Sequence, residues 1–395
     1  MFIMTDLTII NAEIYTPIHR IDNGYVVIEN GVIKKIGSGR PSRIVGELLD
    51  AENNIVAPGF IDTHTHGYNG VDASYSDKND LFKWTREVVR HGVTAIIPST
   101  VTLPHKDTIR ACKNIRDAMR EWSPRKGARI LGVHLEGPYI SKEKRGAQNP
   151  EYIREFSIEE MREYIAVSSN NIRQITVAPE VKGVIENIPF LVQNNIIVSL
   201  GHSNADYATA ERAILMGATK ATHLYNAMSS IHHRKPGIVI ALLRNRNVNL
   251  ELIADLIHVA PEMIMFTFEY AGPYRVVLVT DSISATMLPD GEYELGGLKI
   301  EVRDGIARIA GTNTLAGSTL TMDRAVKNLV KIGLPLQDAL IASTYTPAMS
   351  VHALHREHIG LIAPGYRGDI VILSRKNLDV KYTIIEGIPV YSSEG

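Results

Sequence analysis

The chain has 395 residues, of which 45% are hydrophobic, and a formal net charge of -1 at pH 7. Acidic and basic residues are interleaved, which excludes the basic stripe typical of nucleic-acid binding. No run of about 18 consecutive apolar residues is present, so we expect no membrane-spanning helix. The single cysteine excludes an intramolecular disulfide, and the first residues lack the features of a secretory signal. We therefore expect a cytoplasmic protein.

The two ends of the chain share one pattern. Residues 1–55 contain short runs in which polar and apolar residues alternate, with an Asn30-Gly31 pair typical of a hairpin turn. Residues 356–395 have the same character. We expect both termini to build one small β-sandwich domain.

The segment between them, residues 56–355, alternates between two kinds of pattern. Short apolar runs near residues 56–62, 93–98, 130–135, 172–178, 195–200, 219–223, 250–254 and 276–280 predict strands. Segments with helical periodicity separate them, which is typical of a parallel (β/α)8, TIM-like barrel in the α/β class. Residues near 289–311 predict a β-hairpin inserted after the eighth strand.

The stretch GFIDTHTHG, residues 59–67, ends the first of these strands. Residues two apart in a strand face the same way, so His64 and His66 would present their imidazoles side by side. Such a pair suits a metal ion. The alternative is two unrelated polar residues entering a turn at Gly67.

Polar residues also follow other predicted strands. The set comprises His64, His66, Glu136, His202, His223 and Asp281. A barrel places catalytic groups at the carboxyl ends of its strands, so the joint placement predicts one cluster at the mouth. Imidazole and carboxylate suit Zn²⁺, Fe²⁺ or Mn²⁺. A catalytic metal lowers the pKa of bound water to about 7, and Asp281 would accept and return the proton. The set predicts metal-assisted hydrolysis.

Several segments resemble a known family. PGFIDTHTHG and VLVTDSISA are similar to the first- and eighth-strand signatures of the amidohydrolase superfamily. GVHLEGPYISKEKRGAQNP, GHSNADY, ATHLYNAMSSIHHRKPG and TLAGSTLTMD resemble segments of its N-acetylglucosamine-6-phosphate deacetylases, and the resemblance covers nearly the whole chain. Many relatives carry a carboxylated lysine after the fourth strand. Here VAPE stands there, and Glu136 takes the place of that ligand.

The resemblance implies a role for each matching residue. Glu136, His202 and His223 match the principal metal ligands, and His64 and His66 match a second-metal pair, for one or two divalent ions per subunit, Zn or Fe. Asp281 matches the general acid and base, and His258 matches a catalytic histidine beside the substrate. The implied substrate-binding positions are Ala147, Asn226, Ala227, Arg234, His258, Leu315, Ala316, Gly317 and Ser318, with Arg234 on the phosphate.

The implied activity is hydrolysis of the acetamido group of N-acetyl-D-glucosamine 6-phosphate, in amino-sugar catabolism and cell-wall recycling. Deacetylation of the galactosamine epimer is the alternative, because Gln148 stands where the family often has histidine. A dihydroorotase-like cyclic-amide hydrolase and a non-catalytic scaffold are less consistent with the motifs. The resemblance implies a homodimer and a small phosphosugar as the partner, with no nucleic acid and no membrane.

Three further residues each have two possible roles. His232 and His233 either bind phosphate or are solvated loop residues. Asp255 either supports a ligand histidine or caps a turn. Other residues are expected to be structural: His134, Cys112, His352, His355 and His358.

Overall fold

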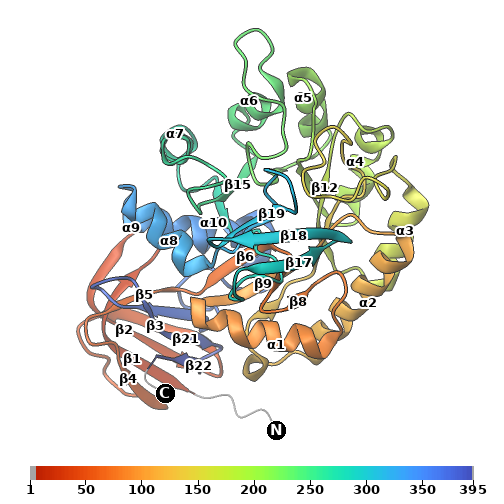
Figure 1. Cartoon of the computed structure of the whole chain (residues 1–395). Coiled ribbons are helices and arrows are strands. Elements are labelled where there is room, and N and C mark those ends of the chain that lie inside the picture. The colour runs from red at the N-terminus through yellow and green to blue at the C-terminus, as the bar shows by residue number, and fades with distance from the viewer. Residues whose placement is uncertain (1–5, 394–395) are drawn as a thin grey trace.

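Eight parallel strands form a barrel in the middle of the chain (Figure 1). The computed structural model describes residues 6–393. The barrel strands are β6 (Phe60–Thr65), β9 (Val93–Thr100), β11 (Val133–Glu136), β12 (Ile172–Val177), β13 (Ile197–Leu200), β14 (Lys220–Ala221), β15 (Asn249–Ile253) and β16 (Val276–Val279), with β10 (Arg129–Ile130) beside β9. The backbone N–H of Asp281 donates to the carbonyl of His64 at 2.9 Å and so links the ends of β16 and β6. The predicted barrel is confirmed.

Helices surround this barrel (Figure 1). They are α1 (Lys78–Val88), α2 (His105–Glu121), α3 (Ile158–Val167), α4 (Val184–Gln193), α5 (Tyr207–Leu215), α6 (Gly237–Arg244), α7 (Pro261–Ala271), α8 (Met322–Lys331), α9 (Leu336–Ser343), α10 (Tyr345–Ser350) and α11 (Ala353–Arg356), with short 3-10 turns at Val89–His91 and Pro124–Lys126. On α8, the buried residues Met322, Ala325, Val326 and Leu329 recur every three or four positions and pack on the barrel. Within residues 6–393, every helix is too short or too polar to span a bilayer.

The two termini form a separate sheet, at the lower left of Figure 1. Its strands are β1 (Leu7–Tyr15), β2 (Arg20–Glu29), β3 (Val32–Ser38), β4 (Glu47–Asp50), β5 (Ile55–Pro58), β20 (Ile370–Leu373), β21 (Val380–Ile385) and β22 (Ile388–Ser392). Their order is β22-β21-β20-β5-β1-β2-β3, with β4 paired to β1, so the C-terminal strands join the N-terminal ones through β5. Ile9, Val26 and Ile372 contribute to an apolar core of its own. The expectation of a small β domain built from both ends is confirmed.

The strand predicted over residues 56–62 is in fact two strands in different sheets. β5 pairs with β1 and β20 in the terminal sheet, whereas β6 belongs to the barrel. Gly59 separates them, and a Cβ there would lie 2.1 Å from the side chain of Thr94. Both strands are buried, so hydrophobicity shows no break between them. The terminal sheet therefore reaches Pro58, beyond the predicted boundary at residue 55.

The insertion predicted as a hairpin near 289–311 is a three-stranded antiparallel sheet. Its strands are β17 (Gly291–Leu295), β18 (Leu298–Arg303) and β19 (Ile306–Ile309). Leu295 and Ile300 pack against Val101, just beyond β9, so the insertion stands beside the carboxyl end of the barrel. A short hairpin follows β6 at the same end, and its two antiparallel strands, β7 (Gly67–Tyr68) and β8 (Val71–Asp72), have two residues each.

Candidate active site

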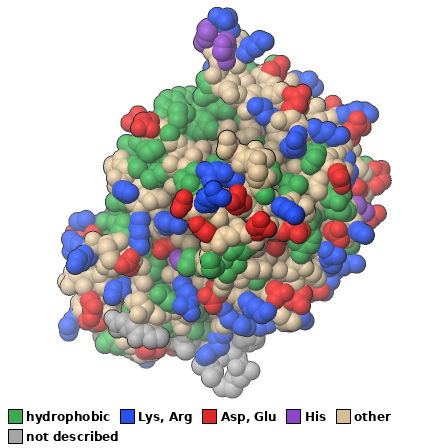
Figure 2. Space-filling view, in the orientation of Figure 1, with side chains coloured by type: hydrophobic (Ala, Val, Ile, Leu, Met, Phe, Trp, Pro, Cys, Tyr) green, Lys and Arg blue, Asp and Glu red, His purple; other side chains and the backbone are tan. Residues whose placement is uncertain are grey.

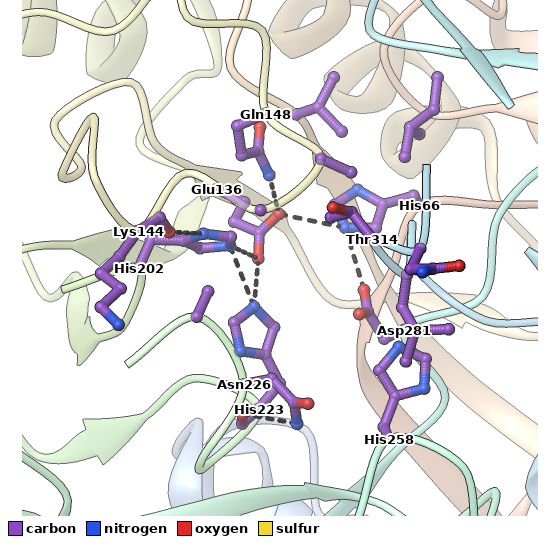
Figure 3. A pocket seen from close by; sticks show the side chains of 18 of the residues that line it. His66, Glu136, Lys144, Gln148, His202, His223, Asn226, His258, Asp281 and Thr314 are labelled. Atoms are coloured by element: carbon purple, nitrogen blue, oxygen red, sulfur yellow. Dashed lines mark hydrogen bonds and ion pairs between the residues drawn. The ribbon is translucent and has the colours of Figure 1, made fainter. Parts of the chain in front are cut away.

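A cavity of about 410 Å³ opens at the carboxyl ends of the barrel strands (Figure 3). Five of the six residues expected to cluster line it: His66, Glu136, His202, His223 and Asp281. The sixth, His64, is fully buried directly behind them. The structure therefore brings together the six strand-end residues that the sequence singled out.

The six residues form two groups of potential metal ligands. We call Glu136, His202 and His223 the triad, and His64, His66 and Asp281 the HxH group; all six residues are buried. In the triad, Glu136 Oε1 lies 3.3 Å from His202 Nε2 and 3.1 Å from His223 Nε2. The same carboxylate reaches the HxH group, because its Oε2 lies 3.3 Å from His66 Nε2. Figure 3 shows Glu136 between the triad histidines and His66.

The spacing of the donor atoms fits divalent metal ions. Within the triad the two Nε2 atoms are 3.1 Å apart, and within the HxH group they are 3.3 Å apart. Asp281 Oδ1 lies 3.2 Å from His66 Nε2. Ligands held at about 2.0–2.1 Å from a tetrahedral ion are about 3.3–3.4 Å from one another. Imidazole nitrogen and carboxylate oxygen are also the donors that such ions take.

Hydrogen bonds turn the ligand histidines toward the metal positions. The Nδ1 atoms of His66 and His202 donate to the carbonyls of Ser99 and Lys144, each at 2.9 Å. His64 Nδ1 donates to Glu251 Oε2 at 2.9 Å. These oxygens only accept, so Nδ1 carries the hydrogen and the lone pair on Nε2 faces the cluster. His223 Nδ1 is buried and has no partner within the described part of the chain.

Three of the site residues have a backbone conformation that side-chain-bearing residues seldom adopt. The φ angles are 46° at His202, 29° at His223 and 51° at Asp281. Each follows the end of its strand by two residues, so the chain turns at once and returns the side chain over the barrel mouth. Left-handed backbone of this kind collects at functional sites, where the surroundings hold it.

Comparison with known proteins agrees with this geometry. Residues 55–390 match the sequence profile of the amidohydrolase family. The chain belongs to this family. An N-acetylglucosamine-6-phosphate deacetylase from Vibrio furnissii is 34% identical over 93% of this chain and 90% of its own. An N-acetylgalactosamine-6-phosphate deacetylase from Escherichia coli O157:H7 is 37% identical over 93% and 94%.

Solved structures of the amidohydrolase family include a close match to the whole fold. A mutant N-acetyl-D-glucosamine-6-phosphate deacetylase from Mycobacterium smegmatis, in complex with N-acetyl-D-glucosamine 6-phosphate, superposes with a TM-score of 0.91 at 32% identity. The match covers 98% of this chain and all of that one. The deacetylase from Thermotoga maritima gives a TM-score of 0.88 at 34% identity, over the same shares of the two chains.

The buried carboxylates of the site, Glu136 and Asp281, need positive charge beside them. Burial disfavours a protonated ring, yet Asp281 and Glu136 raise the pKa of His66 to about 10. Burial likewise opposes ionisation of Asp281, but His64 and His66 hold the pKa of that carboxyl below its usual value. Without a metal, protons on His64 and His66, whose pKa values are both raised, balance the carboxylates. A metal ion would displace those protons and supply the same charge.

The residues expected to bind substrate fall into two sets. Those that line the cavity are Ala147, Asn226, Ala227, His258, Leu315 and Gly317. Ala316 is instead buried against the insertion, and the Ser318 hydroxyl donates to the carbonyl of Thr280. Lys144, Asn313 and Thr314, which the sequence did not single out, also line the cavity.

Arg234 does not line the cavity of its own chain. Residues 231–235, with His232 and His233 among them, are all exposed on the loop that precedes α6. Figure 2 shows histidine and basic side chains at the tip of this projecting loop. No described residue other than the adjacent His233 holds the Arg234 guanidinium, which lies 2.8 Å from His233 Nε2.

Two polar side chains act on the site residues at short range. Asp255 Oδ2 accepts from His258 Nδ1 at 2.7 Å, and its Oδ1 accepts the backbone N–H groups of Ile257 and His258. Asp255 thus caps the turn and orients His258 rather than a metal ligand. Gln148 donates to Glu136 Oε2, and its own Oε1 accepts from Thr102 N at 2.6 Å. The position where the family often has histidine is therefore bound to a triad ligand.

The remaining singled-out residues lie outside the metal groups. His134 is buried with hydrogen bonds at both ring nitrogens, to the hydroxyls of Ser99 and Thr176, each at 2.8 Å. Cys112 is buried, and burial raises the pKa of its thiol to about 12. His352, His355 and His358 join no metal-binding group among residues 6–393.

A charged pair that no sequence motif indicated lies beneath the cluster. Lys220 on β14 and Glu251 on β15 are both fully buried, with Nζ and Oε1 2.9 Å apart. The available signal was a charged residue inside each of two runs predicted as buried strands, because a buried charge needs a partner.

Proposed function

We propose that this chain is a metal-dependent deacetylase that converts N-acetylglucosamine 6-phosphate and water to glucosamine 6-phosphate and acetate. The observation that carries the proposal is the pair of ligand groups joined by Glu136 at the barrel mouth. The named activity of relatives that are 34–38% identical over most of the chain supports the substrate. An amide bond is the group that such a site is suited to cleave.

The proposed chemistry divides between the metal and the chain. A divalent ion held by the triad would polarise the amide carbonyl and lower the pKa of a water molecule. Asp281 faces the same cavity, where it takes the proton of the attacking water and delivers it to the departing amine. His258 also lines the cavity, and Asp255 fixes its Nδ1, so Nε2 is the atom available to the carbonyl oxygen.

We propose Zn or Fe as the native metal, with one or two ions per subunit. The donors are imidazole and carboxylate, which these ions accept. The intact HxH group supports a second ion, because it offers three buried donor atoms beside the triad. Metal analysis of protein purified from its own source would identify the ion.

The galactosamine epimer remains a second candidate substrate. The relative from E. coli O157:H7, which is named for that substrate, favours it, and Gln148 stands where the family often has histidine. A site that hydrogen-bonds one hydroxyl orientation discriminates strongly against the other. The test is kcat/KM for acetate release from both 6-phosphates and from the unphosphorylated sugar. Preference for the glucosamine derivative supports the main proposal, preference for the epimer would replace it, and no turnover of either phosphate would contradict both.

We propose that the phosphate-binding Arg234 acts from a neighbouring subunit of a homodimer. Arg234 does not line the active-site cavity of its own chain, and it lies on an exposed, projecting loop. Ile231 on this loop and Phe266 and Tyr270 on α7 are exposed apolar side chains of the kind that subunit contacts cover. Mixing Arg234→Ala with Asp281→Asn should restore part of the activity, because one site of the mixed dimer has both residues. Absence of recovery, with mixed dimers demonstrated, would contradict shared sites.

We also propose that the reaction takes place in the cytoplasm, in amino-sugar catabolism and cell-wall recycling. The only cysteine is buried and unpaired, which is consistent with a reducing compartment. Cell fractionation with an activity assay would test the location.

A further inference from the structure

Glu251 on β15 touches both metal-ligand groups from below. Its Oε2 accepts from Nδ1 of His64 at 2.9 Å and from the backbone N–H of His223 at 3.2 Å. The carboxylate is fully buried, in the barrel interior behind the cavity. One oxygen therefore holds the imidazole of the HxH group and the backbone of the triad.

The other oxygen of Glu251 is held by two further strands. Lys220 Nζ lies 2.9 Å from Oε1, and Gln174 Nε2 donates to the same atom at 3.0 Å. Lys220 also donates to Gln174 Oε1 at 2.7 Å and to Thr63 Oγ1 at 2.9 Å. All three ammonium hydrogens thus have acceptors, and Glu251 has a counter-ion on the side away from the metals. This satisfies the condition under which buried charges persist.

His64 differs from the other oriented ligand histidines in the kind of group that holds it. His66 and His202 donate to backbone carbonyls, which no substitution removes. His64 instead donates to the side chain of Glu251, which lies 187 residues later in the chain. Among the described residues, Glu251 is the hydrogen-bond acceptor that holds the Nδ1 hydrogen of His64 and so turns Nε2 toward the cluster.

We propose that Glu251, anchored by Lys220 and Gln174, is a positioning residue that sets the affinity of the HxH group for a second metal ion. The inference rests on the proposed metal sites and not on the identity of the substrate. The HxH spacing alone places two rings side by side, whereas Glu251 fixes the tautomer and ring direction of one of them. Removal of such an outer partner typically costs about 10- to 100-fold in metal affinity.

A purely structural role for the ion pair makes a different prediction. Loss of a buried salt bridge would destabilise the barrel and weaken both metal positions together. The positioning role predicts a larger loss at the HxH group than at the triad. Metal stoichiometry and separate dissociation constants distinguish the two, and neither measurement depends on the substrate.

The test compares full-length variants by elemental analysis and by Zn²⁺ titration against a chelating indicator. Glu251→Gln should bind the second ion about 10- to 100-fold more weakly and lose much less affinity for the first. Glu251→Gln leaves the buried Lys220 charged and without a counter-ion, which could prevent folding. The double variant Lys220→Met/Glu251→Gln removes both charges, and the same loss of affinity for the second ion is predicted for it. The Co²⁺ absorption of the second equivalent should change in both variants.

The matched control is Glu357→Gln. Glu357 forms an ion pair at 2.5 Å with the buried Arg173 but contacts no metal ligand. It should lower stability and leave both metal affinities unchanged. Three results would overturn the proposal. The first is a folded Glu251 variant that binds the second ion as tightly as the wild-type protein does, and the second is an equal loss of affinity for both ions. The third is that the wild-type protein binds a single ion and the Glu251 variants bind it with unchanged affinity.

Discussion

Oε2 of Glu136 lies 3.3 Å from Nε2 of His66, although Glu136 ends β11 and His66 follows the end of β6. The other oxygen, Oε1, lies within 3.3 Å of Nε2 of both triad histidines and 3.3 Å from Nε2 of His64. One carboxylate therefore joins the two groups of potential metal ligands. This relationship gives Glu136 a different expected effect from any single histidine.

Glu136→Gln is expected to remove both ions and to lower kcat/KM by more than about 100-fold, because it takes charge from both groups. His66→Gln removes a ligand of the HxH group only and should leave the ion of the triad in place. Elemental analysis of the two purified variants measures the difference. Equal metal content in the two would contradict a bridging role.

Asp281→Asn should lower kcat by about 10²- to 10⁴-fold, the usual contribution of a general acid and base. The amide cannot accept a proton, while the triad keeps all of its ligands. Initial rates of acetate release, with metal content measured on the same samples, test this. Asp304→Asn changes an exposed turn residue in the same way and should retain wild-type kcat. A wild-type kcat in Asp281→Asn would exclude the assigned role.

Metal binding to the metal-free protein should release protons at neutral pH. The pKa of His66 is raised to about 10 by Asp281 and Glu136 against the effect of burial, so the free site holds protons that a metal must displace. Metal affinity should accordingly fall as the pH is lowered. Calorimetric titration in buffers of different ionisation enthalpy counts the protons. A binding enthalpy that is independent of the buffer would show that the histidines are already neutral.

Asp323→Asn tests a second ionic contact, away from the metals. Asp323 Oδ1 lies 2.9 Å from His91 Nδ1, and although burial opposes ionisation, His91 lowers the pKa of Asp323 to about 2. A lowered carboxyl pKa stabilises the fold above about pH 4, by about 2 kcal/mol, and this contribution disappears as the pH falls through about 2.

Urea unfolding of wild type and Asp323→Asn measures this contribution. The difference in unfolding free energy should be full at about pH 5 and about half as large at pH 3. A difference that does not change with pH would assign it to packing instead of charge. Acetate release should be unaffected, because Asp323 does not line the active-site cavity.

The clustering of the six strand-end residues could be predicted from the sequence because each one follows directly from a local pattern. His64 lies in β6 and His66 directly follows its end, and Glu136, His202 and His223 each stand at or just after a strand end. In a parallel barrel all such ends meet at one mouth, so no long-range information is needed to bring them together.

The features that sequence did not predict depend on contacts between distant segments. Lys220 and Glu251 meet only because β14 and β15 are neighbours in register, and neither residue belongs to a recognisable motif. Arg234 fits a phosphate-binding pattern, yet its loop carries it away from the cavity of its own chain. The division between β5 and β6 is hidden because both strands are fully buried.

The most direct test of the central claim is acetate release from N-acetylglucosamine 6-phosphate, measured on one preparation before chelation, after removal of chelator and metal, and after Zn²⁺ or Fe²⁺ is restored. We expect turnover that is lost with the metal and recovered with it, with one acetate released for each primary amine formed. Undiminished turnover by protein shown to be metal-free would contradict the account.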